Sequence, residues 1–226
     1  MRIEKAHIMV PTIDTDLILR RLERCGRVCY KSEDKFAEGS GGGMLRTLIA
    51  KNHASVLEHE KLTMLFVVDR GVSHELVRHR MASYSQESTR YCNYSKDKFG
   101  KEITVIDPFF YQGNERVLWE KTIKVIEESY FALLEMGSTP QEARSILPNS
   151  LKTEIAVTMN MRSLRNFLDL RCSVGAHPQI KEVAIPLLLY LKSKLAPLFE
   201  DISYDENFPK EHYGEIIESD PFFEGF

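Results

Sequence analysis

Residues 78 to 91, with the sequence RHRMASYSQESTRY, hold the densest group of side chains that could do chemistry. Three arginines, at positions 78, 80 and 90, stand among four serine and threonine residues. Guanidinium groups donate forked pairs of hydrogen bonds to phosphate oxygens, and hydroxyl groups add further donors. The alternative is a solvated helix end, because cations are favourable at helix C-termini. Composition alone leaves both interpretations open.

Two further arginines favour anion binding. Arg171 lies in a predicted helix capped by Ser163, on the same face as Leu164, Phe167 and Leu168. A guanidinium group on such a face is costly to desolvate unless an anion or a developing negative charge meets it. Arg144 is also placed between apolar neighbours. The alternative for each is a side chain that extends its charged end into water.

Metal and nucleophile motifs are weak by comparison. His53 and His59, or His74 and His79, could pair on a metal, but neither spacing is specific, and no metal site is predicted. The GSGGG stretch at 39–43 lacks the lysine of a phosphate-binding loop and is interpreted as a flexible turn. The four cysteines are too few and too scattered for a disulfide framework, so reduced thiols are expected at positions 25, 29, 92 and 172.

Length and composition indicate one globular domain, spanning residues 1–226. The chain has 226 residues, of which 43% are hydrophobic and 28% charged, close to the globular average. It has no apolar run of spanning length and no signal-peptide pattern at its N-terminus. A cytoplasmic protein with no membrane partner is therefore expected.

Charge is distributed unevenly along the chain. The net charge is −3, but residues 70–101 carry seven basic and three acidic side chains. This basic segment in an acidic chain indicates a local pocket for anions. The segment 200–226 holds nine acidic residues and one lysine, and we interpret it as an acidic, solvated C-terminal tail.

Apolar periodicity predicts the secondary structure. Strands are expected at 2–10, 57–68, 103–106 and 154–159. Helices are expected at 15–25, after 43, at 73–81 with Ser73 as N-cap, at 114–135, at 140–147, at 164–172, and at 179–199 with an interruption at Pro186. Strands and helices do not alternate as βαβ units. The predicted fold class is α+β: a helix-rich single domain with a mainly antiparallel sheet flanked by helices.

Arg78-His79-Arg80, followed by seven residues and Ser88, resembles the signature of the flavin-dependent thymidylate synthases. The next residues, Thr89-Arg90-Tyr91, are also similar to that family. Three other segments resemble its elements in the same order: HASVLEH at 53–59, ARSILP at 143–148, and NMRSLRNFL at 160–168 with Leu170-Arg171 behind it. Four ordered matches are far more specific than one.

The resemblance implies a reductive methylation in which dUMP, methylenetetrahydrofolate and NADPH give dTMP, with FAD as hydride carrier. It also implies a homotetramer whose active sites are built from several subunits. The ligands carry phosphates or carboxylates, which suits a basic pocket in a net-acidic chain.

By the same resemblance, each site residue has an implied role. His53 would lie near flavin and folate, and Arg171 would be catalytic, polarising the uracil ring so that C5 becomes nucleophilic. The residues implied to contact FAD are Ser55, Arg78, His79, Arg80, Gln86, Asn160, Arg162 and Asn166. The residues implied to line the dUMP site are Glu75, Leu76, Arg78, Gln86, Glu87, Ser88, Thr89, Arg90, Arg144 and Arg171.

Some positions depart from the family pattern. Position 75 is Glu where the family often has Gln, and position 86 is Gln where Glu is expected, so the two may have exchanged roles. No cysteine lies in the Pro-Cys-x-x-His context of the classical thymidylate synthases, so no cysteine nucleophile is expected.

The rival hypothesis is a single-stranded nucleic-acid-binding module. It would use the Arg78–Tyr91 patch, with Tyr84 and Tyr91 stacking on bases. The net charge of −3 and the single short basic region argue against it, and no nucleic-acid partner is expected.

Overall fold

A computed structural model describes residues 1–96 and 100–220. Asp97 and Lys98 of the basic segment, and the last six residues of the acidic tail, lie outside the described residues. The chain forms two compact units that alternate along the sequence. Unit 1 comprises Met1–His7, Phe66–Arg78 and Ser85–Ile155; unit 2 comprises Ile8–Leu65, His79–Tyr84 and the chain from Ala156 onward. The predicted single domain stays a prediction.

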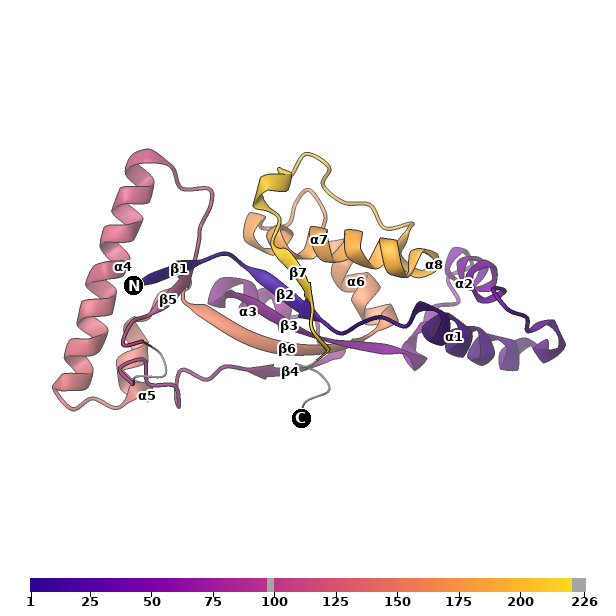
Figure 1. Ribbon diagram of the computed structural model, residues 1–226, viewed down its shortest axis with the longest axis horizontal. Helices are drawn as coiled ribbons and strands as arrows, with labels where there is room; N and C mark the ends of the chain where they lie inside the picture. Colours follow the sequence, from indigo (N-terminus) through magenta and orange to yellow (C-terminus); the bar gives the residue numbers. More distant parts are fainter. Residues whose placement is uncertain (97–99, 221–226) are drawn as a thin grey trace. The chain divides into compact units, whose positions relative to one another are not determined.

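Unit 1 is built around a small parallel strand pair and a long helix (Figure 1). Strand β1 (Arg2–Glu4) pairs with β5 (Thr104–Ile106), and helix α4 (Gly113–Glu135) contributes Ile123 and Tyr130 to the core that the pair also lines. The unit also contains α3 (Arg70–Leu76), α5 (Pro140–Ala143) and the 3₁₀ turn η4 (Arg144–Ile146). The N-terminal ammonium is held by Glu102 and Glu127.

Unit 2 holds most of the helices. They are α1 (Thr15–Tyr30), α2 (Gly41–Ala50), α6 (Met161–Arg171), α7 (Pro178–Lys194) and α8 (Ala196–Phe199), with the 3₁₀ turns η1 (Glu33–Lys35), η2 (Ala54–His59) and η5 (Lys210–His212). Its core is aliphatic and aromatic, and it includes Leu22, Phe167 and Phe199, each fully buried.

The larger sheet has five strands in the order β4-β6-β3-β2-β7. These are β4 (Ala82–Gln86), β6 (Lys152–Asn160), β3 (Lys61–Asp69), β2 (His7–Val10) and β7 (Glu215–Glu218). The boundary between the units falls within β3, after Leu65, and within β6, after Ile155. A mixed sheet flanked by helices confirms the predicted α+β fold class. No helix among residues 1–96 and 100–220 is long and apolar enough to cross a membrane.

Two predicted helix starts are wrong because a different side chain forms the cap. α3 begins at Arg70, and the Asp69 carboxylate accepts the amide N–H of Val72 at 2.6 Å, so Ser73 lies inside the helix. α6 begins at Met161, and Asn160 accepts the amide N–H of Ser163 at 2.8 Å. A cap at the end of a strand starts the helix at once, because its side chain replaces a missing backbone acceptor.

The predicted helix over 73–81 and the polar run after it are also reassigned. α3 ends at Leu76, and residues 82–86 form strand β4 rather than a loop. The β-branched and aromatic content of this segment is low, so the pairing with β6 decides its structure more than local preference does.

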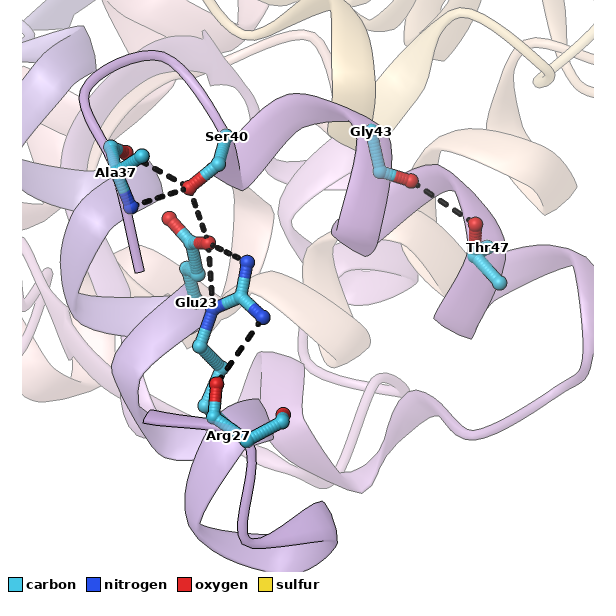
Figure 2. A network of polar contacts seen from close by, with 7 residues as sticks. Glu23, Arg27, Ala37, Ser40, Gly43 and Thr47 are labelled. Carbon is cyan, nitrogen blue, oxygen red and sulfur yellow. Dashed lines mark hydrogen bonds and ion pairs between the residues drawn. The ribbon is translucent and has the colours of Figure 1, made fainter. Parts of the chain in front are cut away.

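The glycine stretch is not a flexible turn throughout, because residues 41–43 form the first turn of α2. Figure 2 shows how the segment before it is held. Glu23 on α1 is fully buried, accepts two hydrogen bonds from Arg27, and accepts a third from the Ser40 hydroxyl. The Ser40 hydroxyl oxygen also accepts the Ala37 N–H at 3.1 Å. A buried ion pair therefore fixes the chain at the start of α2.

The backbone of the acidic tail takes part in the fold as far as residue 220, although most of its described acidic side chains are exposed. β7 joins the larger sheet next to β2, and Ser219 N–H donates to Val10 at 2.9 Å. Asp205 is buried and forms an ion pair with buried Lys181 at 2.8 Å. The interruption predicted at Pro186 is wrong, because α7 continues through this proline to Lys194, and a break at Leu195 separates it from α8.

Candidate active site

The Gln86 side chain is the most constrained candidate in unit 1. It ends β4, and its amide nitrogen donates to Ser73 Oγ at 2.9 Å and to Thr153 Oγ1 at 3.1 Å. Both acceptors are fully buried, one on α3 and the other on β6. Glu87 lies next to it; its backbone N–H donates to Glu154, and its carboxylate accepts from Tyr94 at 3.0 Å.

The residues after β4 form a turn that gathers cations and hydroxyl groups. Within residues 88–92, the amides of Tyr91 and Cys92 donate to the Ser88 carbonyl. Arg90 is exposed, donates to Gln141 at 3.2 Å and stacks over Tyr91 at 5.3 Å. Arg144, also exposed, reaches the hydroxyl of buried Thr89 at 3.5 Å. Unit 1 therefore brings Ser88, Thr89, Arg90 and Arg144 together from two separate chain segments.

Three other predicted nucleotide-site residues belong to α3 and the chain just after it. Glu75 is half-buried and Arg78 is exposed. Leu76 is fully buried, so its side chain contributes to the core in this structure. Its predicted contact with dUMP stays a prediction.

In unit 2, Arg171 and His79 form a contact that joins two predicted site residues. Arg171 ends α6, and its Nε donates to His79 Nε2 at 3.0 Å. The His79 ring also stands edge-on to Phe167, with 5.1 Å between ring centroids, and its carbonyl accepts from Tyr84 at 2.6 Å. Burial and the neighbouring Arg171 charge lower the pKa of His79 to about 4. The imidazole is therefore neutral at pH 7, with Nε2 as acceptor and its proton on Nδ1.

The remaining predicted flavin contacts of unit 2 lie on α6, on η2 and at position 80. Arg162 pairs with Glu58 at 2.6 Å, and both side chains are largely exposed. Asn160 uses its side-chain oxygen as the helix cap, which leaves its amide N–H₂ for other contacts. Ser55, Arg80 and Asn166 are exposed.

His53 stands at the N-terminal end of η2 with an exposed ring. Its Nδ1 is 2.7 Å from the hydroxyl of Tyr30, the last residue of α1, and the two rings lie 6.5 Å apart at 20°. A fixed Nδ1 contact holds the imidazole in one orientation and leaves Nε2 open to a ligand.

Sequence reasoning missed the residues that hold the candidate side chains. These are Tyr30 at His53, Ser73 and Thr153 at Gln86, Gln141 at Arg90, Tyr94 at Glu87 and Glu58 at Arg162. Glu58 carried a signal, since it belongs to the HASVLEH segment. The others are single polar residues without a spacing that marks them.

The four cysteines are free thiols, as predicted. Cys172 is fully buried, and burial raises its pKa to about 12, so it is a protonated, inert thiol. Among the described residues, no three His, Cys, Asp or Glu side chains gather in a way that could hold a metal ion.

Comparisons with known proteins agree with the pattern of these residues. The family model "Thymidylate synthase complementing protein" matches residues 15–197. A flavin-dependent thymidylate synthase of Geobacter sulfurreducens is 34% identical over 184 residues, covering 77% of this chain and 78% of its own. The corresponding protein of Corynebacterium efficiens is 32% identical over 198 residues, covering 81% and 79%.

Solved structures show the same fold. The flavin-dependent thymidylate synthase of Helicobacter pylori, crystallised with FAD and dUMP, superposes with a TM-score of 0.70 at 27% identity, covering 87% of this chain and 99% of the other. The family model and the two relatives span most of the chain, so they include all four motifs. The chain belongs to the flavin-dependent thymidylate synthase family, and it is an enzyme of that kind.

Proposed function

We propose that the chain methylates dUMP to dTMP, taking the one-carbon unit from methylenetetrahydrofolate and reducing equivalents from NADPH through FAD. The observation that carries this proposal is a set of arginines without acidic partners. Within their own units, no carboxylate among the described residues forms an ion pair with Arg80, Arg90 or Arg144. A guanidinium group that no carboxylate neutralises keeps its charge available to an anion.

The residues of unit 2 fit a flavin dinucleotide by their chemistry. A pyrophosphate needs cations and N–H donors, and exposed Arg80, half-buried His79 and the free amide of Asn160 offer both. Ser55, Arg162 and Asn166 are the other proposed FAD contacts of unit 2, and the family resemblance adds Arg78 and Gln86 of unit 1. FAD, when bound, supplies the hydride chemistry that amino-acid side chains lack.

The residues of unit 1 fit the nucleotide. Arg90 belongs to the Ser88–Arg90 turn, Arg144 reaches Thr89 of this turn from a later segment of the chain, and Ser88 and Thr89 add hydroxyl donors. We assign the dUMP phosphate to this turn. Glu75, Leu76, Arg78, Gln86 and Glu87 belong to the same proposed site, which supports recognition of a ligand with both hydrogen-bond donors and acceptors.

Arg171 is the proposed catalytic residue. Methylation at uracil C5 needs electron density at that carbon, and negative charge then develops at N3 and O2. A guanidinium group beside the ring stabilises that charge. The neutral His79 accepts from Arg171 Nε, and this bond helps to hold the planar guanidinium group in one orientation.

The reaction proposed here uses no cysteine nucleophile. The buried Cys172 is protonated, and the sequence around Cys25, Cys29 and Cys92 provides no adjacent base. His53, held by Tyr30, is the proposed contact near the flavin and the folate. The homotetramer and the cytoplasmic location are further parts of the proposal, and they rest on the family resemblance.

The direct test is a spectrum and an assay of the purified protein. The proposal predicts a yellow protein that NADPH bleaches and that forms dTMP only when dUMP and methylenetetrahydrofolate are both present. Replacing each cysteine by alanine should leave this turnover within about twofold of the parent. A flavin-free protein that also fails to bind added FAD would overturn the proposal, and light scattering would test the tetramer.

A further inference from the structure

The amide of Gln86 is fixed by two hydroxyl groups whose own bonding leaves only one arrangement. Ser73 Oγ donates its proton to the Arg70 carbonyl at 2.9 Å, so toward Gln86 it acts as an acceptor. Thr153 Oγ1 accepts the second amide hydrogen at 3.1 Å. An amide carries its donors on nitrogen, so the nitrogen of Gln86 must face the hydroxyls and the carbonyl oxygen must face away.

The outward oxygen has no partner in its own unit. Among the described residues of unit 1, no donor bonds to Gln86 Oε1, and Gln86 itself is only half-buried. The two hydroxyls that hold the amide are fully buried on α3 and β6. Gln86 therefore presents one oriented acceptor from a rigid support, which is how a site discriminates among ligands.

We propose that Ser73 and Thr153 are positioning residues that fix Gln86 as the acceptor for an imide N–H of a bound ligand. This inference rests on the proposed function, which places Gln86 at both the flavin and dUMP. Uracil and the isoalloxazine ring each carry one imide N–H between two carbonyl groups. The imide N–H is a hydrogen-bond donor and not an acceptor, so its partner in the protein must present an acceptor atom such as Gln86 Oε1.

The same geometry explains why glutamine stands where a glutamate is expected. A carboxylate at position 86 has no proton to donate, so both hydroxyls would have to donate to it. Ser73 already donates to the Arg70 carbonyl, and it would have to abandon that bond. Glutamine satisfies both hydroxyls as they stand and still offers an acceptor outward.

The test compares three substitutions on one strand. Thr153→Val keeps the shape of the side chain and removes the acceptor, whereas Thr153→Ser keeps the hydroxyl. Thr158→Val is the matched control, because Thr158 lies on β6 as well but bonds to Thr63 at 2.8 Å. We measure FAD affinity by flavin fluorescence and dUMP affinity by titration of the flavin-loaded protein.

The expected result is a loss of about tenfold in affinity for FAD or for dUMP in Thr153→Val, the size of one misaligned hydrogen bond. Thr153→Ser and Thr158→Val should stay within about twofold of the parent. Loss of dUMP affinity identifies uracil as the ligand group, and loss of FAD affinity identifies the flavin. If Thr153→Val binds both as tightly as the parent, the inference is overturned.

A second variant tests whether Thr153 acts through Gln86 and covers the case in which Thr153→Val does not fold. Gln86→Leu removes the acceptor itself. The double variant, which combines Thr153→Val with Gln86→Leu, should lose no more ligand affinity than Gln86→Leu alone. Additive losses would contradict a positioning role. If Gln86 accepts from uracil, N3-methyl-dUMP, which lacks the imide N–H, should bind the Gln86→Leu variant as tightly as dUMP does. If Gln86 accepts from the flavin, the same comparison is made between FAD and an FAD analogue that lacks the imide N–H.

The two hypotheses fail in different ways. A parent protein that binds neither FAD nor dUMP overturns the proposed function. A parent that binds both, with Thr153 and Gln86 variants that bind both equally well, overturns only the positioning of Gln86.

Discussion

Three arginines of unit 2, one each on α1, α2 and α6, differ from those around the Ser88–Arg90 turn in unit 1. Arg27, Arg46 and Arg165 pair with the carboxylates of Glu23, Glu200 and Asp201. Among the described residues of unit 1, Arg90 and Arg144 make their polar and ring contacts with the neutral side chains of Gln141, Tyr91 and Thr89. A guanidinium group neutralised inside its own unit stabilises the fold, whereas one held by neutral groups keeps its charge available to an anion.

Arg171 lies on the same helix as Arg165, and one of its contacts is the neutral ring of His79. We assign a structural role to Arg165, because it pairs with Asp201, and the proposed catalytic role to Arg171, although both are basic residues six positions apart. The first two predictions separate those roles.

The largest effect is expected from Arg171→Ala. Loss of the charge that stabilises the uracil ring should lower dTMP formation by about 10²- to 10³-fold, the usual cost of one transition-state donor. FAD should remain bound, because Arg171 is not itself among the proposed FAD contacts. Turnover is followed as dTMP formed per enzyme, and FAD content by absorbance.

Arg165→Ala is the control for that substitution. It breaks the pair with Asp201 and should reduce thermal stability while the rate per folded, flavin-loaded enzyme stays near that of the parent. If Arg165→Ala lowers the rate as much as Arg171→Ala does, the separate roles assigned to Arg165 and Arg171 are wrong.

Arg90→Ala and Arg144→Ala should each weaken dUMP binding by about 10- to 100-fold, because each removes a charge-assisted contact to phosphate. The measurement is a dUMP titration of the flavin-loaded protein at two salt concentrations. Arg46→Ala, which removes an exposed pair with Glu200, serves as the control and should leave dUMP affinity unchanged. Equal losses in all three variants would argue for a general effect of charge and against a local phosphate site.

Tyr30→Phe should have a smaller effect, about three- to tenfold on the folate KM, because the phenol acts only through His53. The kcat and the affinity for dUMP should change little. A change in kcat without any change in KM would place Tyr30 in a different role.

The smallest effect concerns pH and the stability of unit 2. The pKa of His79 is lowered to about 4 in the folded state, against about 6.5 in the unfolded chain. Between these values the unfolded state binds the extra proton, so the free energy of unfolding falls as the pH drops from 6.5 to 4. We expect this loss to be about 1 kcal/mol, because half of the ring is solvated.

His79→Gln removes the titrating group and should flatten this part of the curve. Urea unfolding at pH 4, 5, 6 and 7 measures it for both proteins. If the free energy of unfolding changes with pH in the same way in the parent and in His79→Gln, other titratable groups determine the acid sensitivity.

The candidate site could be predicted from the sequence, because the family resemblance rests on motifs whose residues have fixed, short spacings. The long helices α1, α4 and α7 were also predictable, since their apolar residues recur with helical periodicity. The caps were not. Asp69 and Asn160 each end a strand, and the chain gives no local sign that the strand turns into a helix there rather than three residues later.

Other features depend on contacts between distant segments. The sequence of the C-terminal tail predicts a charged, solvated segment. Its strand β7 nevertheless pairs with β2, a strand near the N-terminus. Ser73 and Thr153 are ordinary polar residues in sequence, and only the fold brings them to Gln86. Polar networks of this kind follow from packing, which periodicity does not encode.

The most direct measurement compares dUMP with the uncharged nucleoside deoxyuridine as ligands for the flavin-loaded protein at moderate salt. The account predicts that dUMP binds at least about 100-fold more tightly, since Arg90 and Arg144 meet its phosphate, and that most of this preference is lost in Arg144→Ala. Equal affinities for the nucleotide and the nucleoside would contradict a site built from arginines that keep their charge for an anion.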